Sequence, residues 1–235
     1  MGLWEYELHW PGAAGGFLGR TERPAPARAG GDAVLEALSE LGARAVVEAQ
    51  QVHGGEVATV RERDLAGKQA LVIRGADGLL TDVPGAALAI YVADCLAIFL
   101  HHQSAPAVGL AHAGWRGLAD GMARTLVRSA LAEFGGNVED LRLALSPCIR
   151  RCCFEVGEEV AELFEAVPGA VVRSRPRPHV DMIAVALAQI VAAGVPETAV
   201  EVMSGCTRCE PGRFASYRWD PERCGRNVAL ISVAR

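Results

Sequence analysis

The stretch LAIYVADCLAIFL, residues 88–100, is apolar except for an acid and a thiol at its centre, Asp94 and Cys95. A continuous apolar run of this kind is typical of a strand buried on both faces, where an unpaired carboxylate is costly. Two other strand-like stretches end near a possible partner: VGLAHAGWRG (108–117) contains His112, and QQVHGG (50–55) contains His53. Two histidines and a cysteine can form a three-ligand metal site with one coordination position left open.

The spacing of these residues leaves several interpretations open. Cys95 and His112 are 17 positions apart (112 − 95) and could meet on neighbouring strands, whereas His53 would have to arrive from a third strand end. Alternatively, His53 caps a turn, Cys95 is a small buried hydrophobe, and His112 bonds a backbone carbonyl. A third possibility is a metal-free cysteine hydrolase, with Cys95 as nucleophile and His112 as base.

Composition indicates an ordinary globular protein. The 235 residues are 51% hydrophobic and 22% charged with a net charge of -5, which fits one domain over 1–235 and does not favour nucleic acid as a partner. The acidic N-terminus does not resemble a signal peptide, and no uncharged apolar stretch reaches the roughly 18–20 residues that cross a bilayer. We therefore expect a cytoplasmic protein without a membrane partner. Seven cysteines, an odd number, do not indicate a disulfide framework.

Hydrophobic periodicity predicts a mixed α/β sandwich and not a doubly wound parallel sheet, because strands and helices alternate irregularly. A Gly/Pro/Ala-rich stretch at 11–31 carries no predicted element. Helices are expected at 32–41 with Asp32 as cap, at 115–134, at 156–164, and at 182–193 with Asp181 as cap. Strands are expected at 3–10, 45–51, 56–61, 78–81, 88–100, 107–111, 141–145, 200–203, 214–217 and 228–233.

Several short motifs follow one another in a specific order. They are QVHG (51–54), ADGLLT (76–81), ADC (93–95), HAGWRG (112–117), CFEVG (153–157), CT (206–207), FASYRWD (214–220) and GR (225–226). On these motifs the chain, from about residue 46 onward, resembles the laccase-domain family. Its members are also described as polyphenol oxidases, as purine nucleoside phosphorylases and as bacterial peptidoglycan-editing-factor-like proteins.

The resemblance implies a single α/β domain, a four-layer sandwich of mixed β-sheets flanked by helices. It also implies zinc, with copper as an alternative, held by His53, Cys95 and His112. Some positions depart from the family pattern and concern the substrate more than the metal, namely Ser146, Arg150, Ala215 and Cys224.

A four-copper oxidase is excluded by counting histidines. Such an enzyme needs, beyond its His-His-Cys copper site, about eight further histidines, and this chain has six in all. Phenol oxidation is therefore expected only as a side activity of copper bound in place of zinc, because copper outbinds zinc at nitrogen and sulfur ligands.

Cleavage of a purine nucleoside by phosphate or water fits the remaining residues better. Arg116 and Arg218 are candidate catalytic phosphate clamps, since guanidinium groups bind phosphate bidentately. Ser216 could add a hydroxyl donor and Tyr217 could stack on a base. The alternatives are a surface or carboxylate-paired Arg116 and an internal ion pair of Arg218 with Asp220. The expected partners are a nucleoside, such as adenosine, inosine or methylthioadenosine, and phosphate.

A zinc site would also suit deamination of adenosine, because zinc lowers the pKa of a bound water. Asp94 is the candidate proton shuttle for this reaction, and the alternative is a hydrogen bond from Asp94 that orients a histidine ligand. An editing factor for cell-wall precursors is a function of another class that would use the same residues. The sequence does not indicate an oligomeric state.

The remaining cysteines are not assigned to this site. Cys206 and Cys209 have CxxC spacing, and three more lie together in another turn. Ordinary thiols are the simpler interpretation, and a second structural zinc is the alternative. The unassigned cysteines are Cys148, Cys152, Cys153, Cys206, Cys209 and Cys224.

Overall fold

The apolar run at 88–100 forms two strands in two different sheets. In the computed structural model, which describes residues 3–21 and 32–234, β7 (Ala86–Val92) and β8 (Leu96–His102) are joined by the short turn 93–95. Asp94 lies in that turn, only half-buried, with a φ of 86°. The predicted single strand is therefore wrong. Each half of the run is buried in its own sheet, and Asp94 lies in the crossing between the sheets, where its side chain is only partly buried.

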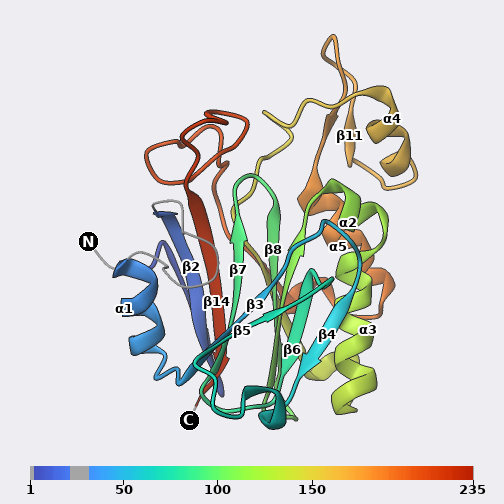
Figure 1. Cartoon of the computed structure of the whole chain (residues 1–235). Coiled ribbons are helices and arrows are strands. Elements are labelled where there is room, and N and C mark those ends of the chain that lie inside the picture. The colour runs from blue at the N-terminus through green and yellow to red at the C-terminus, as the bar shows by residue number, and fades with distance from the viewer. Residues whose placement is uncertain (1–2, 22–31, 235) are drawn as a thin grey trace.

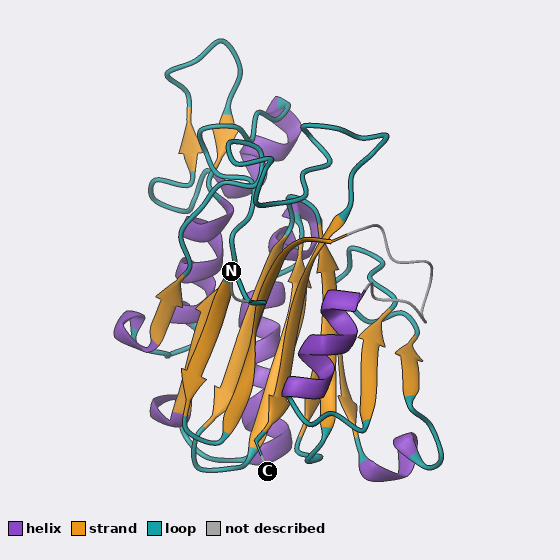
Figure 2. Cartoon of the chain, turned by 90° about the vertical axis from the view of Figure 1, so that its left-hand side faces the viewer, coloured by secondary structure: helices purple, strands orange, loops and turns teal. Residues whose placement is uncertain are grey.

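Twelve strands of the described residues form two mixed six-stranded sheets (Figures 1 and 2). The strand order of the first sheet is β1 (Tyr6–Trp10), β2 (Ala13–Thr21), β14 (Arg226–Val233), β7, β3 (Ala45–Ala49), β5 (Ala70–Ile73). The neighbouring strands from β1 to β7 are antiparallel, whereas β7, β3 and β5 are parallel to one another. The second sheet has parallel pairs at both edges; its order is β13 (Val200–Val202), β10 (Leu141–Leu145), β8, β9 (Ala107–Ala113), β6 (Gly78–Thr81), β4 (Val57–Val60).

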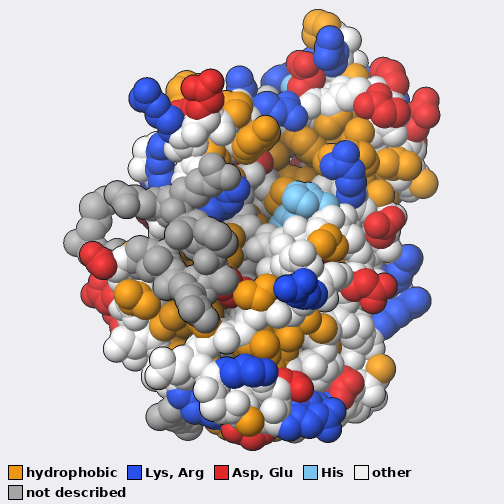
Figure 3. All heavy atoms as spheres, in the orientation of Figure 1, with side chains coloured by type: hydrophobic (Ala, Val, Ile, Leu, Met, Phe, Trp, Pro, Cys, Tyr) orange, Lys and Arg blue, Asp and Glu red, His pale blue; other side chains and the backbone are white. Residues whose placement is uncertain are grey.

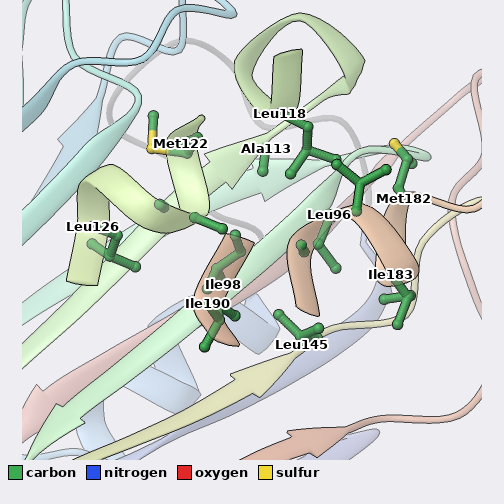
Figure 4. Packing of buried hydrophobic residues seen from close by; sticks show 14 of the residues in the cluster. Leu96, Ile98, Ala113, Leu118, Met122, Leu126, Leu145, Met182, Ile183 and Ile190 are labelled. Carbon is green, nitrogen blue, oxygen red and sulfur yellow. The ribbon is translucent and has the colours of Figure 1, made fainter. Parts of the chain in front are cut away.

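Helices cover the outer faces of both sheets, which makes four layers (Figure 1). The first sheet is covered by α1 (Asp32–Glu40), and the second by three helices: α2 (Trp115–Ala119), α3 (Met122–Phe134) and α5 (Met182–Ala192). Strand β8 shows why its sequence is apolar throughout. Leu96 and Ile98 pack toward the helices, as Figure 4 shows, whereas Ala97 and Phe99 pack between the sheets. The predicted four-layer sandwich of mixed sheets is confirmed.

The predicted elements agree with the structure where local signals are strong. Helix α1 begins at Asp32, and the Asp181 carboxylate accepts hydrogen bonds from the backbone N–H groups of Ile183 and Ala184 at the start of α5. The helix predicted at 115–134 is interrupted at Gly121, whose φ of 86° ends α2 and precedes α3. The helix at 156–164 is reduced to α4 (Glu158–Ala161) and a 3₁₀ turn.

Three expectations about strands are wrong. Residues 214–217 form a turn and not a strand, strand β5 was not predicted, and the glycine-rich stretch contains β2. The glycines of β2 are needed because a Cβ at Gly15 would lie 2.3 Å from the carbonyl oxygen of Leu230 on β14. The rest of that stretch, 22–31, lies outside the described residues.

A short hairpin, β11 (Val171–Val172) with β12 (His179–Val180), completes the set of strands in residues 3–21 and 32–234. The β7–β8 turn, the loop between β3 and β4, and α2 lie near one end of the sandwich, the upper end in Figure 1. None of the described helices is long and apolar enough to cross a membrane.

Candidate metal centre and substrate pocket

Three separate chain segments bring His53, Cys95 and His112 together. His53 lies in the loop between β3 and β4, Cys95 directly precedes β8, and His112 is the penultimate residue of β9. Because β8 and β9 are antiparallel, with Ala97 opposite His112, the thiol reaches the imidazole. One donor atom from each side chain lies within 4.8 Å of the other two, and the two imidazole rings are perpendicular with centroids 4.7 Å apart.

A buried carboxylate, that of Asp77, holds two of these ligands in place. Its Oδ1 accepts hydrogen bonds from Nδ1 of His112 at 2.7 Å and from the backbone N–H of His53 at 2.9 Å. Its Oδ2 accepts from the backbone N–H groups of Val52 and Gly54 at 3.1 and 2.8 Å. Since an ionised carboxylate only accepts, the proton of neutral His112 is on Nδ1, which leaves Nε2 free to bind a metal.

Backbone strain is concentrated around this centre. Among the described residues, positive φ angles at residues other than glycine occur at Gln51, His53 and Asp94, with values of 57°, 65° and 86°. Such conformations are unfavourable for side chains with a Cβ and persist where surrounding contacts impose them. The hydrogen bonds to Asp77 impose the conformation at His53, and two bonds between the Gln51 amide and the backbone of Tyr91 fix Gln51.

Glycines allow the segments to approach one another. A Cβ on Gly114 would lie 3.1 Å from Sγ of Cys95 and 3.3 Å from Cδ2 of His53, and a Cβ on Gly117 would lie 3.0 Å from the carbonyl oxygen of Gly54. Gly114 and Gly117 are the two glycines of HAGWRG. The motif has glycine at these positions because a larger residue would crowd the contact between helix α2 and the loop that carries His53.

Opposite charges at the centre shift the pKa values of its members. Burial alone would raise the pKa of Cys95, but its contacts with His112 and His53 lower it to about 7. Burial would lower the pKa of His112, but hydrogen bonding to Asp77 and the contact with Cys95 raise it to about 9. The pKa of Asp77 is lowered despite its burial, chiefly by the hydrogen bond from His112.

The donor set fits a metal ion. It offers one thiolate and two imidazoles within reach of a single centre, with one imidazole oriented by a carboxylate, as is usual for zinc ligands. His112 bonds a carboxylate and not a backbone carbonyl, so the simplest alternative to a ligand role is wrong for this residue. The pairing of Cys95 with His112 remains compatible with a thiolate nucleophile, which metal analysis distinguishes.

The centre opens into a pocket of about 600 Å³. Figure 3 shows histidine side chains beside a hollow on this face of the molecule, with arginine or lysine side chains nearby. Of the predicted residues, those that line the pocket with the three ligands are Asp94, Arg116, Tyr217 and Arg218. Other lining residues are Gln51, Tyr91, Phe154 and Arg226.

The two predicted clamps are cations without a carboxylate partner among the described residues. Arg116 is exposed, and its guanidinium lies 4.2 Å from the centroid of the Trp115 ring. Arg218 donates to the backbone carbonyl of Glu155 at 3.0 Å and lies over Phe154. No ion pair joins Arg218 to Asp220 in the part of the chain that the structure describes.

Asp94 and Ser216 shape the loop that carries Arg218. The Asp94 carboxylate accepts from the Thr207 hydroxyl at 2.6 Å and from the backbone N–H of Arg218 at 2.7 Å. It does not orient a histidine ligand; Asp77 does. Ser216 is buried and is not among the residues that line the pocket; its hydroxyl accepts from the backbone N–H of Trp219 at 3.2 Å.

Sequence reasoning missed Asp77, Gln51 and Arg226. Asp77 and Arg226 both lie in motifs quoted above, and a carboxylate directly before a strand that neighbours the His112 strand is a recognisable signal. Gln51 also lies in a quoted motif, QVHG, but its role depends on the distant backbone of Tyr91, which the sequence does not show.

Comparisons with known proteins found similar sequences and similar folds. The model of a family described as multi-copper polyphenol oxidoreductase laccase matches residues 28–234. The purine nucleoside phosphorylase YlmD of Geobacillus stearothermophilus is 36% identical over 198 residues, which are 77% of this chain and 70% of that protein. Adenosine deaminase RL5, from an unknown prokaryotic organism, is 34% identical over 80% of this chain and 75% of its own length. The crystal structure of YlmD from Geobacillus stearothermophilus superposes with a TM-score of 0.81 and 28% identity, covering 98% of this chain and 97% of that chain.

Proposed function

The chain belongs to the multi-copper polyphenol oxidoreductase laccase family, and on that premise we propose that it is an enzyme that cleaves purine nucleosides with phosphate. The observation that carries the proposal is the pocket, in which two arginines that have no carboxylate partner among the described residues lie together with the His53–Cys95–His112 centre. A four-copper oxidase remains excluded, because the chain has six histidines and only two of them belong to this centre.

In the proposed reaction an oxygen of phosphate forms a bond to C1′ of the ribose while the bond from C1′ to the purine nitrogen breaks. The base leaves with the bonding electron pair and takes up a proton, and the products are the free base and ribose 1-phosphate. Positive charge develops on the ribose in the transition state. Arg116 and Arg218 would hold the phosphate at that point, and the exposed Tyr217 at the pocket edge would cover the base.

His53, Cys95 and His112 would hold one metal ion, which we propose to be zinc, with copper as the alternative. When bound, such an ion supplies Lewis acidity and can lower the pKa of a water molecule toward about 7. Asp77 keeps Nε2 of His112 available, and the strained loop holds His53 in position, so the chain itself determines where the open side of the centre faces.

Adenosine deamination is a second candidate activity, supported by the similarity to the deaminase RL5. It would require a proton shuttle near the centre, and Asp94 was the sequence-based candidate. Both of its carboxylate oxygens already accept hydrogen bonds, from Thr207 and Arg218. We therefore propose that Asp94 positions Arg218, while the shuttle role is the alternative that an Asp94→Asn variant tests.

The proposal is tested by measuring release of free base from adenosine, inosine and methylthioadenosine, with and without phosphate. We expect base release to depend on phosphate. Arg116→Ala and Arg218→Ala should each raise the KM for phosphate about tenfold or more, because each variant loses a charge-assisted hydrogen bond to phosphate. A chelator should abolish turnover and added zinc should restore it. Release that is unaffected by chelator but abolished by thiol alkylation would instead indicate the cysteine hydrolase. No release from any nucleoside would refute the proposal and favour the cell-wall precursor function.

A further inference from the structure

Four cysteines outside the pocket form a second cluster, which we call the four-cysteine cluster: Cys152, Cys153, Cys206 and Cys209. Cys152 and Cys153 lie in the turn that follows β10, and Cys206 and Cys209 lie in the turn that follows β13. All four sulfur atoms lie within 4.8 Å of one another, and all four thiols are free. Two turns more than fifty residues apart in the chain therefore converge on one point.

The sulfur separations match tetrahedral coordination. Sγ of Cys152 lies 3.6 Å from that of Cys206 and 3.7 Å from that of Cys209, and Sγ of Cys153 lies 3.3 Å from that of Cys209. Zinc–sulfur bonds of about 2.3 Å in a tetrahedron place neighbouring sulfurs about 3.8 Å apart. A disulfide would instead require about 2.05 Å. The cluster thus has the dimensions of a tetrathiolate site.

The surroundings of the cluster suit negatively charged thiolates. The backbone N–H of Arg150 donates to Sγ of Cys206 at 3.5 Å, and Arg175 donates to the backbone carbonyl of Cys152 at 2.8 Å. The Arg208 side chain contacts Cys153. The Arg208 side chain and the backbone N–H of Arg150, which both contact sulfurs of the cluster, would partly offset the net charge of about -2 that four thiolates and one divalent zinc carry.

The cluster lies on a long irregular connection that carries pocket residues. The connection between β13 and β14, residues 203–225, contains no helix or strand. Loops longer than about 12–15 residues without secondary structure are uncommon in compact domains unless something orders them. Yet this connection carries Thr207, which bonds Asp94, and Tyr217 and Arg218, which line the pocket. On the other turn, Phe154 directly follows Cys153 and also lines the pocket.

We propose that Cys152, Cys153, Cys206 and Cys209 bind a second metal ion, zinc, in a closed four-thiolate site that fastens these two turns to each other. The site has a structural role: four protein ligands leave no open position for a substrate. It would fix the wall of the pocket formed by Phe154, Tyr217 and Arg218. This inference does not depend on the proposed reaction, because metal stoichiometry is measured without any substrate.

The test is zinc stoichiometry by native mass spectrometry on purified protein variants. We expect two zinc ions in the parent, one in Cys209→Ser and one in His112→Ala. Cys224→Ser is the matched control, because Cys224 is buried outside both clusters, and it should keep two. The His112→Ala variant retains all four cysteines of the cluster, so it tests the proposal even if Cys209→Ser does not fold.

X-ray absorption on zinc-loaded His112→Ala identifies the ligands directly. Four sulfurs at about 2.3 Å around the remaining zinc are the expected result. Coordination by nitrogen or oxygen would overturn the proposal. So would a metal-free His112→Ala protein, whether its four cysteines react as free thiols or show the mass loss of disulfide formation. In either case base release by the parent would still test the proposed function separately.

Discussion

Replacing Asp77 with asparagine should weaken metal binding at the His53–Cys95–His112 centre without changing any ligand. The Asp77 carboxylate accepts four hydrogen bonds, two on each oxygen, from three backbone N–H groups and from Nδ1 of His112. An asparagine of the same shape can keep two of them on its oxygen, but its NH₂ group then faces two N–H donors. If the NH₂ faces Nδ1 of His112, the imidazole must carry its proton on Nε2, the atom that should bind the metal.

The size of this effect follows from the geometry. Each hydrogen bond to a charged group contributes about 1.5–3 kcal/mol, so losing two should reduce the free energy of unfolding by about 3 kcal/mol or more. Loss of a carboxylate that orients a histidine ligand typically weakens metal affinity by about 10- to 100-fold. We therefore expect Asp77→Asn to raise the zinc Kd of this centre by that factor.

The assay is competition with a chromophoric chelator, together with urea unfolding of the metal-free protein. Asp82→Asn is the control, because Asp82 is half-exposed and pairs with Arg61 at the surface, where an ion pair contributes about 1 kcal/mol or less. A zinc Kd for Asp77→Asn within twofold of the parent would refute the role assigned to Asp77.

Three further predictions concern the same centre. In metal-free protein, the alkylation rate of Cys95 should rise tenfold per pH unit up to about pH 7 and then level, because the thiolate is the reactive form and the pKa of Cys95 is lowered to about 7. In His112→Ala the plateau should move toward about pH 8.5, and the rate at pH 7 should fall about 15-fold. Gly114→Ala, whose Cβ would crowd Cys95, should weaken zinc binding about tenfold, whereas Gly212→Ala, with open space around it, should leave the zinc Kd unchanged. Asp94→Asn should retain base release within about threefold, because an amide can still accept from one donor and donate to a hydroxyl; a loss of more than about 100-fold in deamination would indicate a proton shuttle.

The layers of the fold could be predicted because local signals in the sequence are strong. The caps Asp32 and Asp181 begin helices as expected, and the β10 and β14 segments read correctly as strands. The split of residues 88–100 was not predicted, because both halves are buried on both faces and only Asp94 and Cys95 interrupt the apolar pattern between them. Asp94 lies at the crossing with a positive φ, a conformation in which aspartate is enriched, but a single aspartate does not distinguish a turn from a polar residue within one strand.

In the candidate site, too, the residues with local sequence signals were predicted, and those that depend on tertiary contacts were not. His53, Cys95 and His112 stand out because each ends or begins a strand-like stretch, and the structure brings them together. Asp77 was not assigned a role because its bonds reach 23 to 35 residues along the chain, to partners that only the tertiary fold defines. The four-cysteine cluster is similar: the CxxC spacing is visible, but its convergence with Cys152 and Cys153 depends on two irregular turns.

The most direct measurement is the rate of phosphate-dependent base release by Cys95→Ser after incubation with zinc, relative to the parent and to Cys224→Ser. If the His53–Cys95–His112 centre carries the reaction, Cys95→Ser should be slower by about 100-fold or more, equivalent to about 2.7 kcal/mol of transition-state stabilisation. Cys224→Ser should match the parent. Parental turnover in Cys95→Ser would contradict a role for the centre in nucleoside cleavage.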